Sequence, residues 1–408
     1  MRKTLILTGV LGLCALGSSA WGAQACPGNG GCIYSPVCPK GGKSVKTMKD
    51  LLSAINKAKD GATICVQPGK YVGKIDFHGK PITLKSTGGP GVTFLDGGGT
   101  GPVVWFHTSE GANSVLAGFT VQNGQAPNGG GILIQNASPT LHYNIILGNK
   151  ATGAGGYGRG GGLHVAGASA KPVITCARFV RNEAEFAGGG LATTYFADPY
   201  VRSSHFEANR APYGGAIASH FNGRLDLATT LIVANEATGD GGGIHSGTPY
   251  GNVLVRNVCL KDNKAGSQGG GVWVPAGLAE VVNSTFTGNQ ASVGGGLAVG
   301  FGSLVSVSAT LFTANTTSGG SATLVNAGGS NTGLINHYNG FFGNTGATHL
   351  GTYGDLGLVF LDPALTQCGG CCPGTVSPAI DAGIPDYHFD EADGTRDDMG
   401  ACGGPVVY

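Results

Sequence analysis

The chain has 408 residues, of which only 12% are charged, and its formal net charge at pH 7 is +1. This balance provides no polybasic surface for nucleic acid or anionic lipid, so we exclude both as partners. Glycine accounts for 77 residues without a three-residue period, which excludes collagen and predicts many turns or close backbone contacts.

The first 25 residues have the layout of a cleaved secretory signal. Arg2 and Lys3 precede an apolar run from Leu5 to Leu16, and small residues follow up to Ala25. A membrane anchor is the alternative, but the run is shorter than the ~18 apolar residues that span a bilayer. No later segment is apolar for long enough to be transmembrane. We therefore expect a secreted protein, either extracellular or on the outer cell surface.

Eleven cysteines are present, and ten remain once Cys14 leaves with the signal. An even number in an oxidising compartment predicts disulfides. The cysteines crowd a Cys-rich segment at residues 26–43 and a closing segment at residues 351–408. A zinc site is the alternative, but the Cys371-Cys372 doublet and the lack of paired C-x-x-C units disfavour it. The spacing leaves the connectivity open.

The stretch from Ser44 to Lys59 predicts a helix. Its apolar residues recur at helical spacing, at Met48, Leu51, Leu52, Ile55 and Ala58. Ser44 is the candidate N-cap. We expect this helix to cap the open end of the core that follows, because a solenoid must block strand pairing at its ends.

Short strand patterns follow the helix, at residues 63–66, 82–84, 92–95 and 115–116, with turns at Pro68-Gly69 and Asp96-Gly97. A repeat of 25 to 31 residues then begins. Its marker is a Gly triplet followed by an aliphatic residue, at Gly129, Gly160, Gly188, Gly241, Gly269 and Gly294, with the variant Gly-Gly-Ala-Ile at Gly214. Coils this short have no room for a crossover helix and can bury their apolar side only by stacking. We predict an all-β fold, a parallel β-helix solenoid over residues 44–350.

Two ladders are expected along the solenoid axis. The first is an Asn three residues after an aromatic or aliphatic residue, at Asn149, Asn182, Asn209, Asn235, Asn263, Asn289, Asn315 and Asn344. Asn tolerates the left-handed turn conformation, and its amide can hydrogen-bond the next Asn in the stack. The second ladder is the following position, Lys150, Glu183, Arg210, Glu236, Lys264 and Gln290. A catalytic carboxylate pair is the alternative there, but the alternating sign favours salt bridges that fix the register.

The Gly214–Ile217 tetrapeptide and the Phe-x-x-Asn forms resemble the repeats of the chlamydial-type polymorphic outer membrane proteins. The stretch from Gly61 to Tyr71 is similar to the opening of many pectate-lyase-like right-handed β-helix proteins, and residues 377–404 are similar to the closing segment of many secreted bacterial ones. The resemblance implies a right-handed parallel β-helix and an extracellular surface role such as that of an adhesin at the outer membrane.

The resemblance to pectate-lyase-like enzymes also raises the question of catalysis. Those enzymes bind acidic sugars with clustered Asp calcium ligands and an Arg base, and no such cluster occurs in this sequence. Hydrolysis by paired carboxylates needs two of them within about 5–9.5 Å. The candidates are Glu185 with Glu207, and Asp240 with Asp262. The catalytic residues stay unknown, and we lean against an enzyme.

The middle residue of each three-residue strand after a triplet is expected to point outward, which gives the column Leu133, His164, Ala192, Ala218, His245, Trp273 and Ala298. His164 and His245 are three coils, or about 14 Å, apart, too far to share a metal. We expect both to be solvated surface histidines. The alternative is a shallow aromatic face for sugar rings, with Trp273, Tyr213, His245 and His164 as ligand-binding residues.

The acidic segment near the end of the chain is the candidate metal site. Asp390, Asp393 and Asp397 supply oxygen ligands of the kind that calcium prefers, so calcium is the one candidate cofactor. The spacing matches no EF-hand, which favours the alternative of a solvated acidic loop.

The sequence is compatible with two functions. The first is a non-catalytic secreted or cell-surface β-helix that serves adhesion, envelope structure or polysaccharide binding. The second is a polysaccharide lyase or glycoside hydrolase built on the same fold. The fold alone does not decide between them, because a β-helix hosts both.

Overall fold

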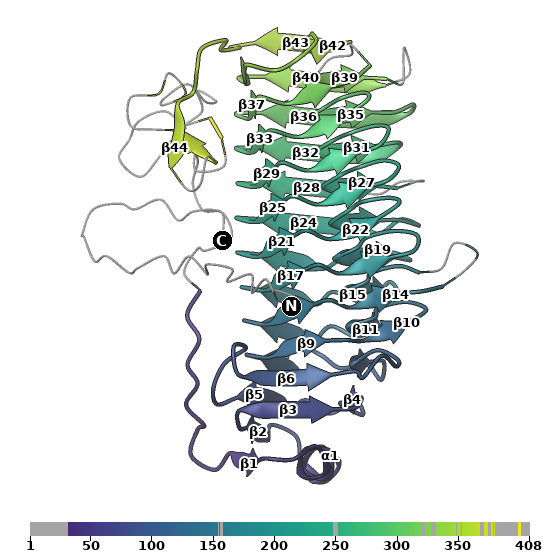
Figure 1. Cartoon of the computed structure of the whole chain (residues 1–408), viewed down its shortest axis with the longest axis vertical. Helices are drawn as coiled ribbons and strands as arrows, with labels where there is room; N and C mark the ends of the chain where they lie inside the picture. The colour runs from purple at the N-terminus through teal and green to yellow at the C-terminus, as the bar shows by residue number, and fades with distance from the viewer. Residues whose placement is uncertain are drawn as a thin grey trace, which may run out of the picture.

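The computed structural model describes residues 32–153, 155, 158–247, 252–319, 323–327, 332–347, 349–351, 353–367, 371–373, 377, 379 and 399–400. This part of the chain winds as a parallel β-solenoid (Figure 1). Each complete coil passes through four sheets, which we number 1 to 4 in chain order. The predicted parallel solenoid is therefore confirmed.

The strands of each sheet stack one coil above another. Sheet 1 consists of β1 (Lys43–Val45), β2 (Thr63–Val66), β5 (Thr83–Ser86), β8 (Val115–Ala117), β12 (Thr140–His142), β16 (Val173–Thr175), β20 (Tyr200–Arg202), β24 (Arg224–Ala228), β28 (Asn252–Arg256), β32 (Gly277–Val282), β36 (Ser303–Ser308), β40 (Gly333–His337) and β43 (Tyr353–Leu356). Sheet 2 consists of β3 (Gly69–Val72), β6 (Thr93–Asp96), β9 (Thr120–Gln122), β13 (Ile145–Leu147), β17 (Arg178–Val180), β21 (His205–Glu207), β25 (Leu231–Val233), β29 (Cys259–Lys261), β33 (Thr285–Thr287), β37 (Leu311–Thr313) and β41 (Gly340–Phe342).

The other two sheets complete each coil. Sheet 3 consists of the short strands β10 (Gln125–Ala126), β14 (Lys150–Ala151), β18 (Glu183–Ala184), β22 (Arg210–Ala211), β26 (Glu236–Ala237), β30 (Lys264–Ala265), β34 (Gln290–Ala291) and β38 (Thr316–Thr317). Sheet 4 consists of β4 (Ile75–Asp76), β7 (Val104–Phe106), β11 (Ile132–Gln135), β15 (Leu163–Ala166), β19 (Leu191–Thr194), β23 (Ile217–Ser219), β27 (Ile244–Ser246), β31 (Val272–Val274), β35 (Leu297–Val299), β39 (Leu324–Asn326) and β42 (His349–Leu350). Outside the solenoid, β44 (Leu365–Gln367) pairs with β45 (Cys372–Pro373) in antiparallel fashion.

The interior is a single apolar core that runs along the axis. The core cluster extends from Val45 to Phe341, and its side chains come from the inward positions of the sheets. Within it, the rings of Phe179 and Phe206 stack with their centroids 4.4 Å apart. Each coil therefore buries its apolar side against the coil above and below, as the length of the repeat requires.

The Gly triplets mark the tight turn from sheet 3 to sheet 4. The first glycine of the triplet has a left-handed backbone, as at Gly188 with φ 66°. A Cβ on the second, at Gly189, would lie 2.5 Å from the carbonyl oxygen of Gly215 in the next coil. Only glycine lets successive backbones stack this closely, which explains why the triplet recurs once per coil.

The Asn ladder is confirmed, but its backbone differs from the prediction. The side-chain amide of each Asn donates to the Oδ1 atom of the next, for example from Asn209 to Asn235 over 2.9 Å. The same Oδ1 accepts the backbone N–H of Asn209. The left-handed residue is the one before the Asn, such as Ala208 with φ 53°. The Asn is thus selected for its amide in a buried position and not for its tolerance of an unusual φ.

The charge ladder lies in register on sheet 3. Lys150 pairs with Glu183 in the strand ladder, and the Nζ and Oε2 atoms are 3.6 Å apart. Arg210 and Glu236 are the next such ion pair, at 3.9 Å. Exposed pairs contribute only about 0.2–1 kcal/mol each, so their value lies in fixing the register.

One helix, α1 (Met48–Lys57), lies at the N-terminal end of the solenoid and contacts β1 and β2 (Figure 1). Leu51 and Ile55 bury its inner side in the core. Its N-cap is Thr47, whose hydroxyl accepts the N–H of Asp50, so the assignment of Ser44 as N-cap is wrong. No helix among the described residues is long and apolar enough to cross a bilayer.

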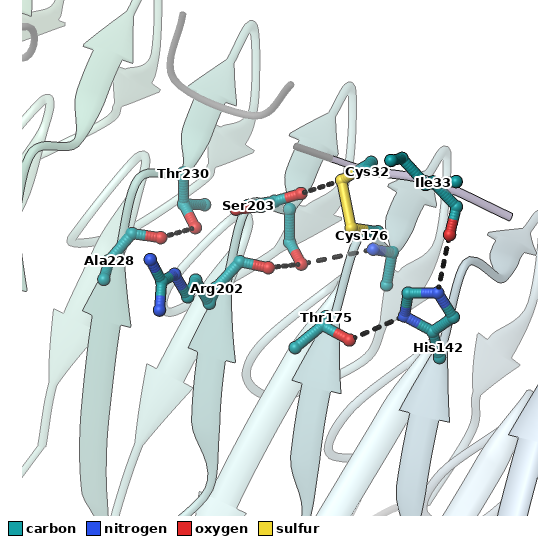
Figure 2. Close-up of a disulfide and its surroundings, with 11 residues drawn as sticks. Cys32, Ile33, His142, Thr175, Cys176, Arg202, Ser203, Ala228 and Thr230 are labelled. Atoms are coloured by element: carbon teal, nitrogen blue, oxygen red, sulfur yellow. Dashed lines mark hydrogen bonds between the residues drawn. A yellow bond between two sulfur atoms is a disulfide. The ribbon is translucent and has the colours of Figure 1, made fainter. Parts of the chain in front are cut away.

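Residues 32–42, which we call the N-terminal strap, run beside the solenoid (Figure 1, purple) and contact the C-terminal ends of sheet 1 strands. Disulfides join Cys38 to Cys65 and Cys32 to Cys176, so the strap spans coils that are more than 100 residues apart in sequence. Figure 2 shows the upper attachment, where His142 bridges the carbonyl oxygen of Ile33 and the hydroxyl of Thr175.

Between the two disulfides, Tyr34 fixes the strap to the solenoid. Its ring stacks on Tyr143 with centroids 5.1 Å apart. Its hydroxyl donates to the carbonyl oxygen of Ser86 and lies 3.3 Å from that of Ala117. Burial, opposed by the hydrogen bond to Ser86, raises the pKa of Tyr34 to about 12.

Described residues of the closing segment contact the outer face of sheet 2. Cys371 forms a disulfide with Cys259 and accepts, through its carbonyl oxygen, the hydroxyl of Thr285 over 2.8 Å. Farther along, Ala379 and Met399 pack against Leu311. Three disulfides are present among the described residues, in agreement with the prediction of disulfides, and they attach both end segments to the body of the solenoid.

Candidate functional site

The outward column of sheet 4 has the register that the repeat predicts. His164 pairs with Leu133 on one side and with Ala192 on the other, and His245 pairs with Ala218 and Trp273. The middle residue of each strand thus forms one ladder on the outside of the core.

The side chains of this ladder are nevertheless buried. His164, His245 and Trp273 are only 5%, 6% and 7% exposed, so the expectation of solvated surface histidines is wrong. Trp273 packs against Ala298 and Val325, which follow it in the same column. The ligand-binding role assigned to Trp273, Tyr213, His245 and His164 stays a prediction. Tyr213 is half-buried, whereas the other three side chains are buried beneath the surface.

Residues from the turns between sheets 3 and 4 provide the cover. Arg159 lies in the coil of His164, with its guanidinium 4.8 Å from the ring centroid of Phe186 and 5.1 Å from that of Phe221. Such cation–π contacts are strongest where the pair is desolvated. Arg159 therefore joins three successive coils across the outside of sheet 4.

Aromatic and imidazole rings continue this layer. The rings of His220 and His245 stack with centroids 5.0 Å apart, and Tyr213 lies 5.4 Å from His245. Phe186 contacts both Tyr213 and His220. The sequence did not predict the places of Phe186 and His220 in this layer, because neither residue type recurs at the equivalent position of the other coils.

Burial holds the pKa values of three histidines low in this layer. Burial, with the nearby Arg159 charge, lowers the pKa of His164 to about 3 and that of His220 to about 4. Burial, followed by repulsion from His220, lowers the pKa of His245 to about 3. The Nδ1 atoms of His164 and His245 and the Nε2 atom of His220 have no hydrogen-bond partner among the described residues. A proton added to one of these ring nitrogens would therefore be buried without a hydrogen-bond acceptor.

We predict that acid destabilises the protein through these histidines. The unfolded chain takes up their protons below pH 6.5, whereas the folded protein resists until the pKa values of about 3 to 4. The contribution of these three histidines to the free energy of unfolding is therefore complete above pH 6.5. It falls on acidification, by up to about 1.4 kcal/mol per pH unit for each histidine. Urea unfolding from pH 7.5 to 4.5 measures this slope. A His220→Phe/His245→Phe variant should have a shallower slope, and equal slopes would contradict the prediction.

Large aromatic side chains stand exposed beside this buried layer. Tyr195, Phe196 and Phe221 are 54%, 57% and 41% exposed, and we call these three residues the aromatic patch. They lie in the turns from sheet 4 to sheet 1 of two neighbouring coils, and the rings of Tyr195 and Phe221 stack with centroids 5.4 Å apart.

The backbone of the aromatic patch is strained. All three residues have a left-handed φ, of 55°, 64° and 50°. Bulky residues rarely adopt this conformation, which costs on the order of 1 kcal/mol or more where glycine or asparagine would fit. Stability alone therefore does not account for aromatic residues at these positions.

Two hollows flank the aromatic patch. Tyr195 lines one of about 580 Å³, together with Gln135, Asn136 and His164. Phe196 lines the other, of about 340 Å³, together with Lys171, Asp198, Asn222 and Arg224. The two neighbouring residues thus present an apolar ridge between two depressions that carry polar groups.

The candidate carboxylate pairs do not occupy matching positions in the coils. Glu207 lies in β21 of sheet 2 with its Oε2 atom 3.2 Å from Arg178, whereas Glu185 follows β18 of sheet 3. Asp262 follows β29 of sheet 2, whereas Asp240 follows β26 of sheet 3 and accepts the N–H of Gln268.

The predicted calcium ligands Asp390, Asp393 and Asp397 lie outside the described residues, so the calcium site stays a prediction. Within the described residues, no group of three or more His, Cys, Asp and Glu side chains is placed to hold a metal ion.

The outward column also begins earlier than the triplets suggested. Trp105 pairs with Leu133, stacks on His107 at 3.7 Å between centroids, and has the ammonium of Lys74 3.8 Å from its own ring centroid. His107 contacts Asp76 over 3.0 Å. Burial raises the pKa of Asp76, but its hydrogen bond with His107 and other contacts outweigh burial and hold that pKa below its usual value. The alternation in Val104-Trp105-Phe106 was the available signal.

No protein-family model matches the sequence, and no curated protein is significantly similar to it.

Proposed function

We propose that the protein is an extracellular β-helix that binds a polysaccharide on the aromatic patch without cleaving it. The observation that carries the proposal is the combination of Tyr195, Phe196 and Phe221, exposed in left-handed turns between two hollows that contain polar side chains. A linear glycan fits this shape, because a chain of sugar rings is long enough to cross the ridge and contact both hollows. A compact ligand would contact only one of them.

The chemistry of the patch suits sugar rings. The C–H face of a pyranose is apolar and packs on an aromatic ring, while its hydroxyl groups need polar partners at the edge. Gln135 and Asn136 supply amides in one hollow, and Lys171 and Asp198 supply a charged pair in the other.

The buried layer supports this role by holding the patch rigid. Arg159 lies against Phe221, and Phe221 in turn stacks on Tyr195. Aromatic residues that are already ordered lose little conformational entropy on binding, so more of the contact energy appears as affinity.

Three further features belong to the proposal. The disulfides and the signal-like first 25 residues favour secretion. The solenoid is expected to be right-handed, because crossovers between parallel strands almost always are. Helix α1 is expected to cap the core, since Leu51 and Ile55 close its first coil.

We predict that the variant Tyr195→Ala/Phe196→Ala/Phe221→Ala loses retention on immobilised polysaccharide by at least about tenfold, because the stacking surface is removed. Affinity electrophoresis against acidic and neutral glycans measures this retention. Phe301→Ala is the matched control, since Phe301 is also exposed, at 66%, and follows β35 at the corresponding corner of the solenoid. Equal retention of the triple variant and the parent protein would refute the proposal.

The same panel tests the enzymatic alternative. Incubation of the protein with each glycan, with and without calcium, is followed by absorbance of unsaturated products and by reducing ends. We expect neither signal. Product on any substrate would replace the binding proposal by a lyase or hydrolase, and would direct attention to Glu185, Glu207, Asp240 and Asp262.

A further inference from the structure

A groove of about 920 Å³ lies between helix α1 and the first strands of sheet 1. Its apolar lining includes Ala54 and Ala58 of the helix side and Ile64 of β2. This groove lies at the N-terminal end of the solenoid and is separate from the aromatic patch.

The edge of a sheet borders the groove. Strand β1 pairs with β2 on one side only and is the terminal strand of sheet 1. The carbonyl oxygen of Val45 accepts the N–H of Gln67 on the β2 side. Because backbone groups alternate along a strand, the N–H and C=O of Ser44 point to the opposite edge. An extended peptide can add there as a further strand.

The charge around the groove is positive. Lys43, Lys46, Lys57 and Lys59 line it, against the single carboxylate of Asp50. Among the described residues, none of these lysines has an ion-pair partner within 4.0 Å. The protein as a whole carries a net charge of only +1, so this end concentrates positive charge. An acidic partner is therefore favoured.

The sequence contains such a partner. Residues 386–398 include six Asp and Glu residues against one Arg, and they begin Asp386-Tyr387-His388-Phe389-Asp390. In an extended conformation the two aromatic side chains point to one face and the two carboxylates to the other. In that arrangement the aromatic face would suit the apolar lining of the groove, and the carboxylate face would suit the surrounding lysines.

The segment cannot reach the groove of its own chain. Ala379 and Met399, on either side of it, pack against Leu311, which follows β36. Nine strand steps separate β36 from β2 in sheet 1, or roughly 43 Å at about 4.8 Å per step. The 19 residues between the two anchors must run out from Leu311 and return to it. Even fully extended, their midpoint therefore lies at most about 32 Å from Leu311, which is less than the distance to the groove.

We propose that the groove binds the acidic segment 386–398 of a second copy of this chain, which adds to the edge of β1 as a parallel or antiparallel strand. The contact joins different surfaces of the two copies, so it propagates head to tail into a chain of molecules. This proposal does not depend on the polysaccharide-binding function.

A labelled peptide with the sequence of residues 386–398, titrated with the intact protein, tests the contact by fluorescence anisotropy. We expect saturable binding that weakens as salt rises. The variant Lys46→Glu/Lys57→Glu should weaken it by about tenfold or more. The variant Lys40→Glu/Lys49→Glu is the matched control, because it changes the charge equally at exposed lysines that do not line the groove.

Two further reagents separate strand addition from simple charge attraction. A scrambled peptide of the same composition without the alternation should bind more weakly than the native one. Ser44→Pro removes the outward N–H of β1 without changing charge and should also weaken binding, with circular dichroism to show that the fold persists. Equal binding of both peptides to all proteins would overturn the proposal.

Sedimentation velocity of the full-length protein tests the assembly itself. We expect a weight-average sedimentation coefficient that rises with protein concentration in the parent and in the Lys40→Glu/Lys49→Glu control, and stays constant in Lys46→Glu/Lys57→Glu. A monomer at all concentrations, or a groove that binds an acidic glycan fragment but not the peptide, would overturn the proposal.

Discussion

Replacement of Asn289 by Ala is expected to lower the free energy of unfolding by about 3–5 kcal/mol. The Asn289 amide donates to the carbonyl oxygen of Leu260 over 2.8 Å and to the Oδ1 atom of Asn315 over 2.9 Å. Its own Oδ1 atom accepts the backbone N–H and the side-chain amide of Asn263. Alanine leaves several of these buried groups without a partner, and each costs about 1–3 kcal/mol.

The adjacent position provides the control for this prediction. Gln290 is exposed in β34, and Gln290→Ala should change the free energy of unfolding by less than about 0.5 kcal/mol. Asn344→Ala should fall between the two, because Asn344 is only half-buried. Denaturant unfolding measures all three. Equal losses for Asn289→Ala and Gln290→Ala would show that the amide ladder does not stabilise the fold.

Removal of the disulfide between Cys32 and Cys176 is the second large effect. The two residues are 144 positions apart, against 27 for Cys38 and Cys65. Restriction of the unfolded chain grows with the closed loop, which gives about 5 kcal/mol for the first disulfide and about 3.5 kcal/mol for the second. We expect Cys32→Ala/Cys176→Ala to be the more destabilised of the two double variants in denaturant unfolding.

Tyr34 reports on the strap in the same experiment. Burial raises its pKa to about 12 in the intact protein. Without the disulfide between Cys32 and Cys176, the strap loses its upper attachment, and the ionisation of Tyr34 should return toward its ordinary pKa of 10.0. Ultraviolet titration of tyrosinate measures this shift. An unchanged titration, together with equal stability losses for the two double variants, would contradict a role of this disulfide in holding the strap.

The repeat was predictable because it depends on contacts between equivalent positions. Gly189 and Asn209 each contact the equivalent residue one coil away. One repeat in the sequence therefore corresponds to one coil along the solenoid axis. Any pattern that repeats in such a ladder can be recognised without knowing the rest of the structure. The parallel strands and their register follow from it.

The candidate site was not predictable in the same way. Alternation correctly placed His164 and His245 outside the core, but outside does not mean exposed. Arg159 lies directly before its Gly triplet, in register with Asn128 and Ala187. The residue at this position differs from coil to coil, so the repeat does not predict the contact of Arg159 with Phe186. Tyr195, Phe196 and Phe221 of the aromatic patch lie in turns, and their left-handed backbone emerges only from the three-dimensional structure.

The attachment points of the two end segments have a mechanical consequence. A pull on the chain beyond Cys32 is transmitted through its disulfide to Cys176, and a pull beyond Cys371 is transmitted to Cys259. Only three strand steps of sheet 2, from β17 to β29, lie between these points. While both disulfides are intact, the covalent path of tension between these two points therefore passes through a short central section of the solenoid.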